Sequence, residues 1–243
     1  MNIKEANILS KKIQHIGFIM DGNRRWAVKN NLPKKYGHKQ GVENLKNILK
    51  LIKKLEIKHT TFFTLSKDNK KKRGQEEYNN LMNLAKEEFD SLEQIFNDKQ
   101  ENNTKYARIK IFGNYNTLRE DVVDKLKKLE NKTKNYDDFY VNFCINYDGQ
   151  EEIINGVKQL LQNDIDVNEI NKETLKKYLY TNESPPPEII IRCGNLPRLS
   201  GFLLWDSQYS EIYFSPKMWP EFNEKDFFNV LKWYNGVERK FGK

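Results

Sequence analysis

The sequence is poor in several kinds of residue, and each shortage excludes a class of protein. It holds 2 cysteines and 3 histidines among 243 residues. Cys144 and Cys193 lack the spacing of metal ligands, so we expect two reduced thiols and neither a zinc site nor a disulfide. No run of 18 apolar residues occurs, so no segment is expected to span a bilayer. Residues 1–7 lack the apolar core of a signal peptide, and we therefore expect a cytoplasmic protein.

Basic residues, by contrast, are abundant. Lysine and arginine number 42 against 34 acidic residues, which gives a formal net charge of +8. This charge favours an anionic partner such as a diphosphate, a lipid headgroup surface or a nucleic acid. The lysines are dispersed and no nucleic-acid-binding module is present, so we expect no nucleic acid. Hydrophobic residues make up 37% of the chain, which is enough for a folded core.

Strand patterns and helical patterns alternate along the chain. The expected strands are residues 16–20, 59–65, 107–112, 139–147 and 188–192. Apolar stripes at helical spacing cover residues 42–55, 78–92 and 153–161. This alternation predicts a single α/β domain over residues 1–243, with a largely parallel central sheet flanked by helices. Residues 1–14 would form an N-terminal extension and residues 238–243 a C-terminal tail.

The most informative stretch places an acid, a glycine and two arginines directly after a buried-strand pattern. Asp21 would lie at the carboxyl end of the strand, where α/β sheets bind ligands, and its carboxylate suits Mg²⁺. Gly22 permits a sharp turn. A helix beginning near Arg25 or Trp26 would aim free N–H groups at an anion, and Arg24 and Arg25 could bind phosphate oxygens. The stretch predicts a site for a metal-bound phosphate; the alternative is a simple turn with a solvated basic face.

Five blocks of sequence follow one another in a recognisable order. They are residues 15–27 (HIGFIMDGNRRWA), 34–41 (KKYGHKQG), 64–69 (TLSKDN), 191–205 (IRCGNLPRLSGFLLW), and 209–214 with 219–222 (YSEIYF and WPEF). In this order the blocks resemble the motifs of the cis-prenyltransferases, the family of undecaprenyl and dehydrodolichyl diphosphate synthases. The resemblance extends from about residue 15 to residue 242.

The resemblance implies an activity. A chain of this family would use Mg²⁺ to condense isopentenyl diphosphate onto an allylic diphosphate such as farnesyl diphosphate. The product would be a polycis-polyprenyl diphosphate of the undecaprenyl or dehydrodolichyl type, a precursor of a glycosyl carrier lipid. The family also implies a homodimer, a hydrophobic tunnel for the growing chain, and peripheral contact with a membrane through the lipid product, at the endoplasmic reticulum in a eukaryote.

Residue roles carry over by position. The resemblance implies catalytic roles for Asp21 and Asn69 and metal ligation by Asp21 and Glu211. The matching substrate-binding positions are Gly22, Asn23, Arg24, Arg25, Trp26, Lys34, His38, Ser66, Lys67, Asp68, Lys70, Lys72, Arg192, Arg198, Leu199 and Ser200. Arg192, Arg198 and Ser200 would bind isopentenyl diphosphate. Because an amide is a poor base, we interpret Asn69 as a positioning group or relay.

Some positions leave alternatives open. His38 would contact a diphosphate in the family, but a histidine after a glycine could also cap the next helix or bond a backbone carbonyl. Leu196 stands where the family often has a carboxylate, and residues 70–73 replace an aromatic residue and an arginine. These departures keep a second hypothesis open, a non-catalytic binding subunit of a heteromeric prenyltransferase. Phe62 and Phe143 could either limit product length or simply pack in the core.

Overall fold

The part of the chain that the structure describes is built on six parallel strands. The computed structural model describes residues 3–67, 74–97 and 105–237. The strands are β1 (His15–Ile19), β2 (His59–Ser66), β3 (Ala107–Phe112), β4 (Phe139–Tyr147), β5 (Ile189–Arg192) and β6 (Glu211–Phe214). Every neighbouring pair is parallel, in the order β3-β4-β2-β1-β5-β6. The predicted parallel α/β sheet is therefore confirmed.

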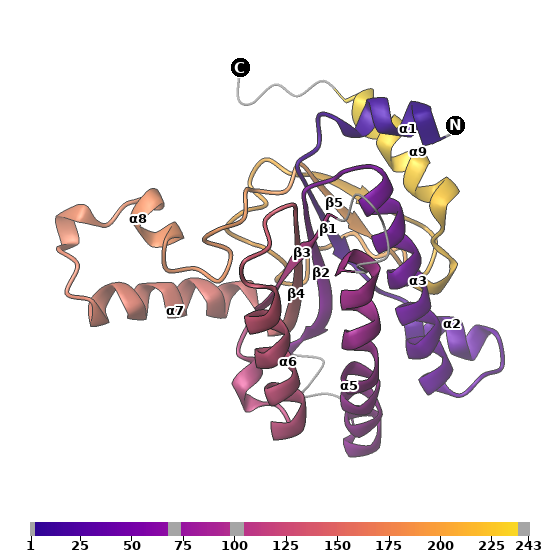
Figure 1. The fold of residues 1–243 in the computed structure, drawn as a ribbon, viewed down its shortest axis with the longest axis horizontal. Coiled ribbons are helices and arrows are strands. Elements are labelled where there is room, and N and C mark those ends of the chain that lie inside the picture. Colours follow the sequence, from indigo (N-terminus) through magenta and orange to yellow (C-terminus); the bar gives the residue numbers. More distant parts are fainter. Residues whose placement is uncertain (1–2, 68–73, 98–104, 238–243) are drawn as a thin grey trace.

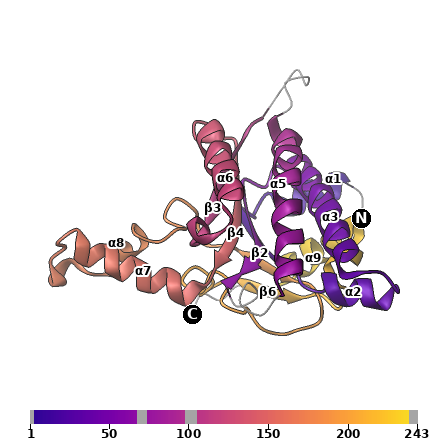
Figure 2. The same ribbon diagram turned by 90° about the horizontal axis from the view of Figure 1, so that it is seen from below.

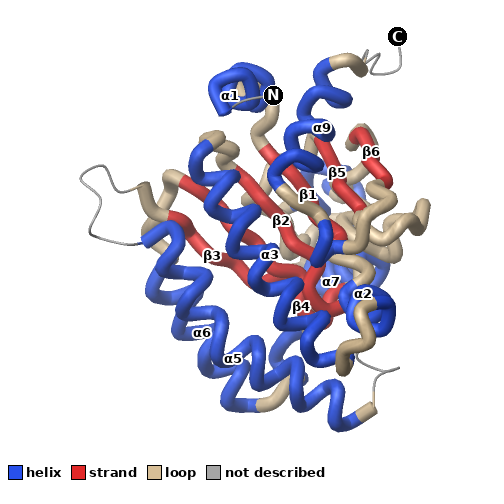
Figure 3. The backbone as a smooth tube through the Cα atoms, turned by 90° about the vertical axis from the view of Figure 1, so that its right-hand side faces the viewer, coloured by secondary structure: helices blue, strands red, loops and turns tan. Residues whose placement is uncertain are grey.

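Helices cover the sheet and extend beyond it. The described helices of five or more residues are α1 (Ile3–Ser10), α2 (Asn23–Lys29), α3 (Lys34–Lys54), α5 (Gln75–Asn97), α6 (Glu120–Thr133), α7 (Gly149–Gln162), α8 (Lys172–Lys176) and α9 (Glu224–Asn235). Three short 3-10 turns, Tyr115–Thr117, Val167–Glu169 and Trp219–Glu221, complete the described helical structure. Helices α3, α5 and α6 lie over one face of the sheet (Figure 3). Helices α7 and α8 project away from it, as Figure 1 and Figure 2 both show.

The core has two layers because successive strand residues point to opposite faces of the sheet. On the face beneath α3, α5, α6 and α9, Phe18 and Phe62 stack with their ring centroids 5.0 Å apart, and Phe62 stacks on Phe143 at 5.9 Å. On the other face, Phe63 stacks on Phe202 at 5.2 Å. Phe202 belongs to the loop after β5, so this loop covers the face that the helices leave open.

β1 lies near the middle of the sheet, between β2 and β5. All five of its residues are buried, as expected for a parallel strand covered on both faces. Because these strands are parallel, the carboxyl ends of β1, β2 and β5 lie side by side. Residues 20–25, 66–67 and 192–201 therefore come together at the same edge of the sheet. None of the described helices is long and apolar enough to cross a bilayer.

Candidate active site

The turn after β1 positions Asp21. Gly22 has φ of +106°, a backbone conformation that favours glycine, and a Cβ there would lie 2.7 Å from Met218 Cβ. α2 begins at Asn23, slightly earlier than the start near Arg25 or Trp26 that the sequence predicted. The Trp219 N–H donates to the Asp21 carbonyl over 2.9 Å. The turn is thus fixed by residues from the far end of the chain.

The Asp21 carboxylate lies between two guanidinium groups. Arg192 Nη2, at the carboxyl end of β5, donates to Asp21 Oδ2 over 2.8 Å. Arg25 Nη2, on α2, lies 3.2 Å from Asp21 Oδ1. Arg25 also donates to the Gly194 carbonyl over 2.9 Å. The Asp21 side chain keeps 30% of its surface exposed, so the carboxylate remains open to a ligand from the cleft.

Arg192 is the most buried charged group of the site, with 3% of its side chain exposed. Its Nη1 donates to Ser200 Oγ over 2.8 Å and to the Arg198 carbonyl. Burial lowers the pKa of Arg192, and the charges of Arg198 and Arg25 lower it further, whereas Asp21 raises it. Within the described ranges, the buried Arg192 Nε has no hydrogen-bond partner. This crowding of positive charge would stabilise an anion bound nearby.

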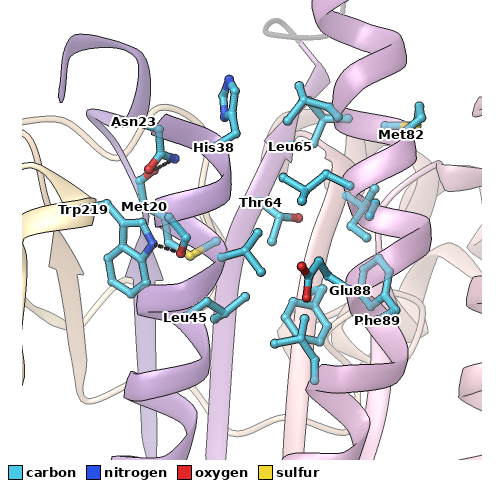
Figure 4. Close-up of a pocket in the computed structure, with 18 residues that line it drawn as sticks. Met20, Asn23, His38, Leu45, Thr64, Leu65, Met82, Glu88, Phe89 and Trp219 are labelled. Atoms are coloured by element: carbon cyan, nitrogen blue, oxygen red, sulfur yellow. Dashed lines mark hydrogen bonds between the residues drawn. The ribbon is translucent and has the colours of Figure 1, made fainter. Parts of the chain in front are cut away.

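The block at residues 34–41 serves largely to pack α3 against α2. A Cβ at Gly37 would lie 2.1 Å from the Asn23 carbonyl oxygen, and one at Gly41 would lie 2.4 Å from Asn23 Oδ1. The two glycines therefore let α2 approach α3 more closely than any side chain would permit. Trp219 Nε1 donates to the Gly41 carbonyl over 2.7 Å (Figure 4). The close packing places His38, between the two glycines, beside Asn23.

A polar cleft and an apolar pocket adjoin at this edge of the sheet. The cleft has a volume of about 810 Å³ and contains Asp21, Arg25 and Arg192. The pocket has a volume of about 130 Å³ and lies between α3, α5 and the sheet (Figure 4). The residues that line both are Met20, Asn23, His38, Thr64 and Leu81. A ligand with a charged head and an apolar tail could therefore place its head in the cleft and its tail in the pocket.

His38 stands where the cleft and the pocket meet. Its Nε2 lies 3.4 Å from Glu77 Oε1 on α5, and Glu77 Oε2 lies 3.7 Å from Arg24 Nη1 on α2. His38 belongs to the interior of α3, since that helix begins at Lys34 with Pro33 as its N-cap. The helix-cap interpretation of His38 is therefore wrong. Contact with a diphosphate stays a prediction.

The structure brings ten of the predicted residues together around the cleft: Asp21, Gly22, Asn23, Arg24, Arg25, His38, Ser66, Arg192, Arg198 and Ser200. Other predicted residues lie elsewhere. Leu199 packs against the part of the core that contains Phe63 and Phe202, and Lys67 forms an ion pair with Glu151 of α7. Trp26 and Lys34 do not line the cleft within the described residues. Asn69, Asp68, Lys70 and Lys72 lie outside the described residues, as does the C-terminal tail 238–243.

Glu211, the second predicted metal ligand, does not lie at the edge of the sheet that carries Asp21. It pairs in register with Ile189, whereas Arg192 pairs with Phe214. At about 3.3 Å per strand residue, Glu211 lies roughly 10 Å before the edge that carries Asp21. The single chain therefore does not join Glu211 to Asp21.

Several residues of the site were not predicted from sequence. Asp148 and Gln150 line the cleft at the start of α7, where Asp148 accepts hydrogen bonds from the N–H groups of Gln150 and Glu151, each over 3.0 Å. Met218 and Trp219 hold the Asp21 turn. The Asp148-Gly149 pair directly after a strand was the available signal for the first two. Trp219 lies in the fifth block but was given no role there, and no local pattern indicated Met218.

The fit to Mg²⁺ depends on Asp21. Among the described residues, no three histidine, cysteine, aspartate or glutamate side chains come together as a metal-binding group. Mg²⁺ does not need such a group, because it commonly binds one or two carboxylates and completes its shell with substrate phosphates and water. Asp21, partly exposed at the edge of a cleft that is rich in cations for phosphate, fits this pattern.

Comparisons with known proteins agree with the geometry. The sequence profile described as putative undecaprenyl diphosphate synthase matches residues 19–242. An isoprenyl transferase of Thermotoga maritima is 39% identical over 234 residues, covering 94% of this chain and 96% of that protein. A tritrans,polycis-undecaprenyl-diphosphate synthase of Thermoplasma volcanium, described as geranylgeranyl-diphosphate specific, is 35% identical over 237 residues, covering 95% and 89%.

A solved structure is similar over the same length. Lavandulyl diphosphate synthase from Lavandula x intermedia, in complex with dimethylallyl diphosphate, superposes with a TM-score of 0.87 at 27% identity. The match covers 95% of this chain and 98% of that one. Since both the family profile and the curated relatives span nearly the whole sequence, the chain belongs to the cis-prenyltransferase family of undecaprenyl diphosphate synthases.

Proposed function

We propose that this prenyltransferase uses Mg²⁺ to condense isopentenyl diphosphate onto an allylic diphosphate and makes a polycis-polyprenyl diphosphate. The observation that carries the proposal is the junction of the cation-rich cleft with the apolar pocket beside Asp21. Such a junction fits a substrate with a diphosphate head and an isoprenoid tail. The apolar pocket would be the start of the tunnel that holds the growing chain.

The reaction needs two diphosphates held side by side. We assign the allylic diphosphate to the turn at Asp21 and Arg25, because the apolar pocket opens next to it through Asn23 and His38. We assign isopentenyl diphosphate to Arg192, Arg198 and Ser200. Held this way, the allylic substrate would lose its diphosphate group as its C–O bond breaks. The double bond of isopentenyl diphosphate would attack the resulting allylic cation, and the new cation would lose a proton to give the elongated diphosphate.

Charge neutralisation is the main task of the protein in this chemistry, because the leaving diphosphate gains negative charge in the transition state. Mg²⁺ held by Asp21 would stabilise that charge when it is bound. Arg25 is already aligned by its contact with the Gly194 carbonyl, so it can bind the same oxygens without losing much conformational freedom. Asn69 and Ser66 are proposed to orient the substrate for proton loss.

The primer is proposed to be farnesyl diphosphate, with geranylgeranyl diphosphate as the second candidate. The Thermoplasma volcanium relative is described as specific for geranylgeranyl diphosphate, which supports testing both. The product would be of the undecaprenyl or dehydrodolichyl type and would serve as a precursor of a carrier lipid for sugars. We propose a cytoplasmic enzyme that contacts a membrane surface through this lipid product.

A homodimer is proposed as the working form. Ile154, Val157 and Leu161 lie on one side of α7, and 54%, 43% and 66% of each is exposed. An exposed apolar row at helical spacing favours a protein partner. A second copy would cover this row, and it could also complete the metal site, for which the single chain does not position Glu211.

The alternative is a non-catalytic subunit. Leu196 lines the polar cleft in place of the family's usual carboxylate, which supports keeping this hypothesis. Incorporation of radiolabelled isopentenyl diphosphate by the purified chain alone separates the two. We expect incorporation with one of the two primers that stops when EDTA removes the metal. An active mixture that needs a second protein would instead favour the subunit.

A further inference from the structure

One charged residue interrupts the apolar stripe of α5. The positions that face the pocket recur at helical spacing, and Leu81, Ala85 and Leu92 fill three of them. Glu88 fills the position between Ala85 and Leu92, where the pattern calls for an apolar residue. Its side chain extends from α5 toward the pocket, beside Phe89 (Figure 4). A carboxylate on an apolar wall is costly unless it is paired, so its partners indicate its role.

Glu88 is paired across the gap between two helices. Lys46 Nζ, on α3, lies 2.6 Å from a Glu88 carboxylate oxygen, and the two side chains are only 19% and 18% exposed. Ser91 Oγ donates to Glu88 Oε2 over 2.9 Å. Although burial opposes ionisation of both groups, their mutual hydrogen bond raises the pKa of Lys46 and lowers that of Glu88. The ion pair therefore ties α3 to α5 at the pocket wall.

The position of this pair along the pocket matters. The cleft end of the pocket is marked by Leu81, which also lines the cleft. Glu88 lies seven residues further along α5, about 10 Å from Leu81 at 1.5 Å per residue. An isoprenoid that enters from the cleft must pass between α3 and α5 at this level to grow toward Leu92.

The pocket is too small for a long product. An apolar cavity of about 150 Å³ holds one benzene molecule. The pocket of about 130 Å³ therefore holds about one isoprenyl unit. A longer chain requires α3 and α5 to separate or their side chains to move, and the Lys46–Glu88 pair resists that separation.

We propose that the Lys46–Glu88 ion pair limits product length by clamping α3 to α5 and by keeping a charge in the path of the growing isoprenoid. This inference rests on the proposed function. It adds a specificity determinant that lies away from both diphosphate sites. The clamp and the charge both oppose elongation of the isoprenoid, so loss of the pair should lengthen the product.

The test uses two single variants and a matched control. Glu88→Gln keeps the size of the side chain and removes its charge, and Lys46→Met removes the opposite charge. Glu43→Gln is the control, because Glu43 contacts the same lysine over 2.9 Å within α3 and is 49% exposed. Products made from farnesyl diphosphate and isopentenyl diphosphate are separated by chromatography, and folding is checked by thermal unfolding.

We expect Glu88→Gln to lengthen the main product by one or more isoprenyl units, because it removes both the ion pair and the charge on the pocket wall. Lys46→Met removes only the ion pair, so it should lengthen the product by no more than Glu88→Gln does, and Glu43→Gln should leave the length unchanged. The double variant Lys46→Met with Glu88→Gln should shift it no further than the larger single effect, because the two residues act as one pair. Lys46→Arg should keep the wild-type length.

Unchanged lengths in folded, active Glu88→Gln would overturn the inference. So would an equal shift in the Glu43→Gln control. Failure of the proposed function itself is a separate result, since wild-type protein would then form no polyprenyl product with either primer.

Discussion

Arg192 Nη2 donates to Asp21 Oδ2 over 2.8 Å, although the two residues are 171 positions apart in the chain. The contact exists because β1 and β5 are parallel neighbours, with Ile19 in register with Arg192. It joins the residue assigned to the metal with the residue assigned to isopentenyl diphosphate. The two proposed diphosphate sites therefore adjoin at this ion pair, and a substitution in one site should affect the other.

The two arginines of the isopentenyl diphosphate site should respond differently to removal. Arg198→Ala removes an exposed cation, so we expect the KM for isopentenyl diphosphate to rise about ten- to a hundredfold, from a charged hydrogen bond worth about 1.5–3 kcal/mol, with stability unchanged. Arg192→Ala should raise the same KM and also lower the melting temperature, because Asp21 and Ser200 lose a buried partner. Steady-state kinetics and thermal unfolding measure both. An effect confined to the allylic primer would reverse the subsite assignment.

The close approach of α2 and α3 makes Gly37 sensitive to substitution. Gly37→Ala would place a methyl group against the Asn23 carbonyl, so we expect a loss of about 1–3 kcal/mol and reduced activity as Asn23 and His38 shift. Gly236→Ala is the matched control, because a Cβ there lies 3.4 Å from the nearest atom at ordinary φ. Urea unfolding compares the two. Equal stability in both variants would contradict the packing account.

The structure gives Phe62 and Phe143 different roles, although the sequence left the same two roles open for both. Phe62 is fully buried among other rings of the core, whereas Phe143 lines the apolar pocket and packs edge-on against Phe89 at 5.5 Å. Phe62→Ala should therefore cost about 3–5 kcal/mol with no change in product length. Phe143→Ala should lengthen the product. Chromatography of the products decides, and a longer product from Phe62→Ala alone would reverse the assignment.

A buried histidine predicts the pH dependence of stability. His15 Nε2 lies 2.8 Å from Thr61 Oγ1 and Nδ1 lies 2.6 Å from the Pro185 carbonyl. Burial lowers the pKa of His15 to about 3, against about 6.5 in the unfolded chain. Below pH 6.5 the unfolded state therefore binds a proton at His15 that the folded state does not bind. The free energy of unfolding accordingly falls as the pH drops. Between pH 7 and pH 5 this group contributes a loss of about 1–2 kcal/mol.

The measurement is the free energy of unfolding in urea at pH 7 and pH 5. His59 adds to the loss, because burial also lowers its pKa, to about 4. The variant His15→Gln removes one of the two groups and should show a smaller difference between the two pH values. An identical difference in wild type and variant would show that His15 does not titrate as its burial indicates.

The sequence predicted the sheet well where strands are buried. Residues 107–112 and 139–147 have the predicted bounds. Residues 139–147 are buried along almost their whole length, as in a strand covered on both faces, whereas the first four residues of 107–112 alternate between buried and partly exposed positions. β6 was not predicted as a strand. It has four residues at the sheet edge, none of them buried, so it carries neither a buried run nor an alternating pattern.

The site could be predicted only where one segment forms it. The Asp21 turn follows from residues 16–26, which contain the strand, the glycine and the cations together. The ion pair of Asp21 with Arg192 depends on the strand order, which local patterns do not contain. The role of Trp219 depends on a contact between residues almost 200 positions apart. Glu211 shows the same limit, because its register places it below the site edge.

The central claim is that the Asp21 carboxylate supports the chemistry rather than the fold. The most direct test is turnover of Asp21→Asn and Asp21→Ala with saturating farnesyl diphosphate, isopentenyl diphosphate and excess Mg²⁺. We predict loss of nearly all turnover in both variants, because the carboxylate is assigned to the metal. Asp21→Asn, which keeps an acceptor for Arg192, should retain a melting temperature close to that of the wild type, whereas Asp21→Ala leaves the buried guanidinium unpaired and should lower it. Near-normal turnover in either variant would contradict the account.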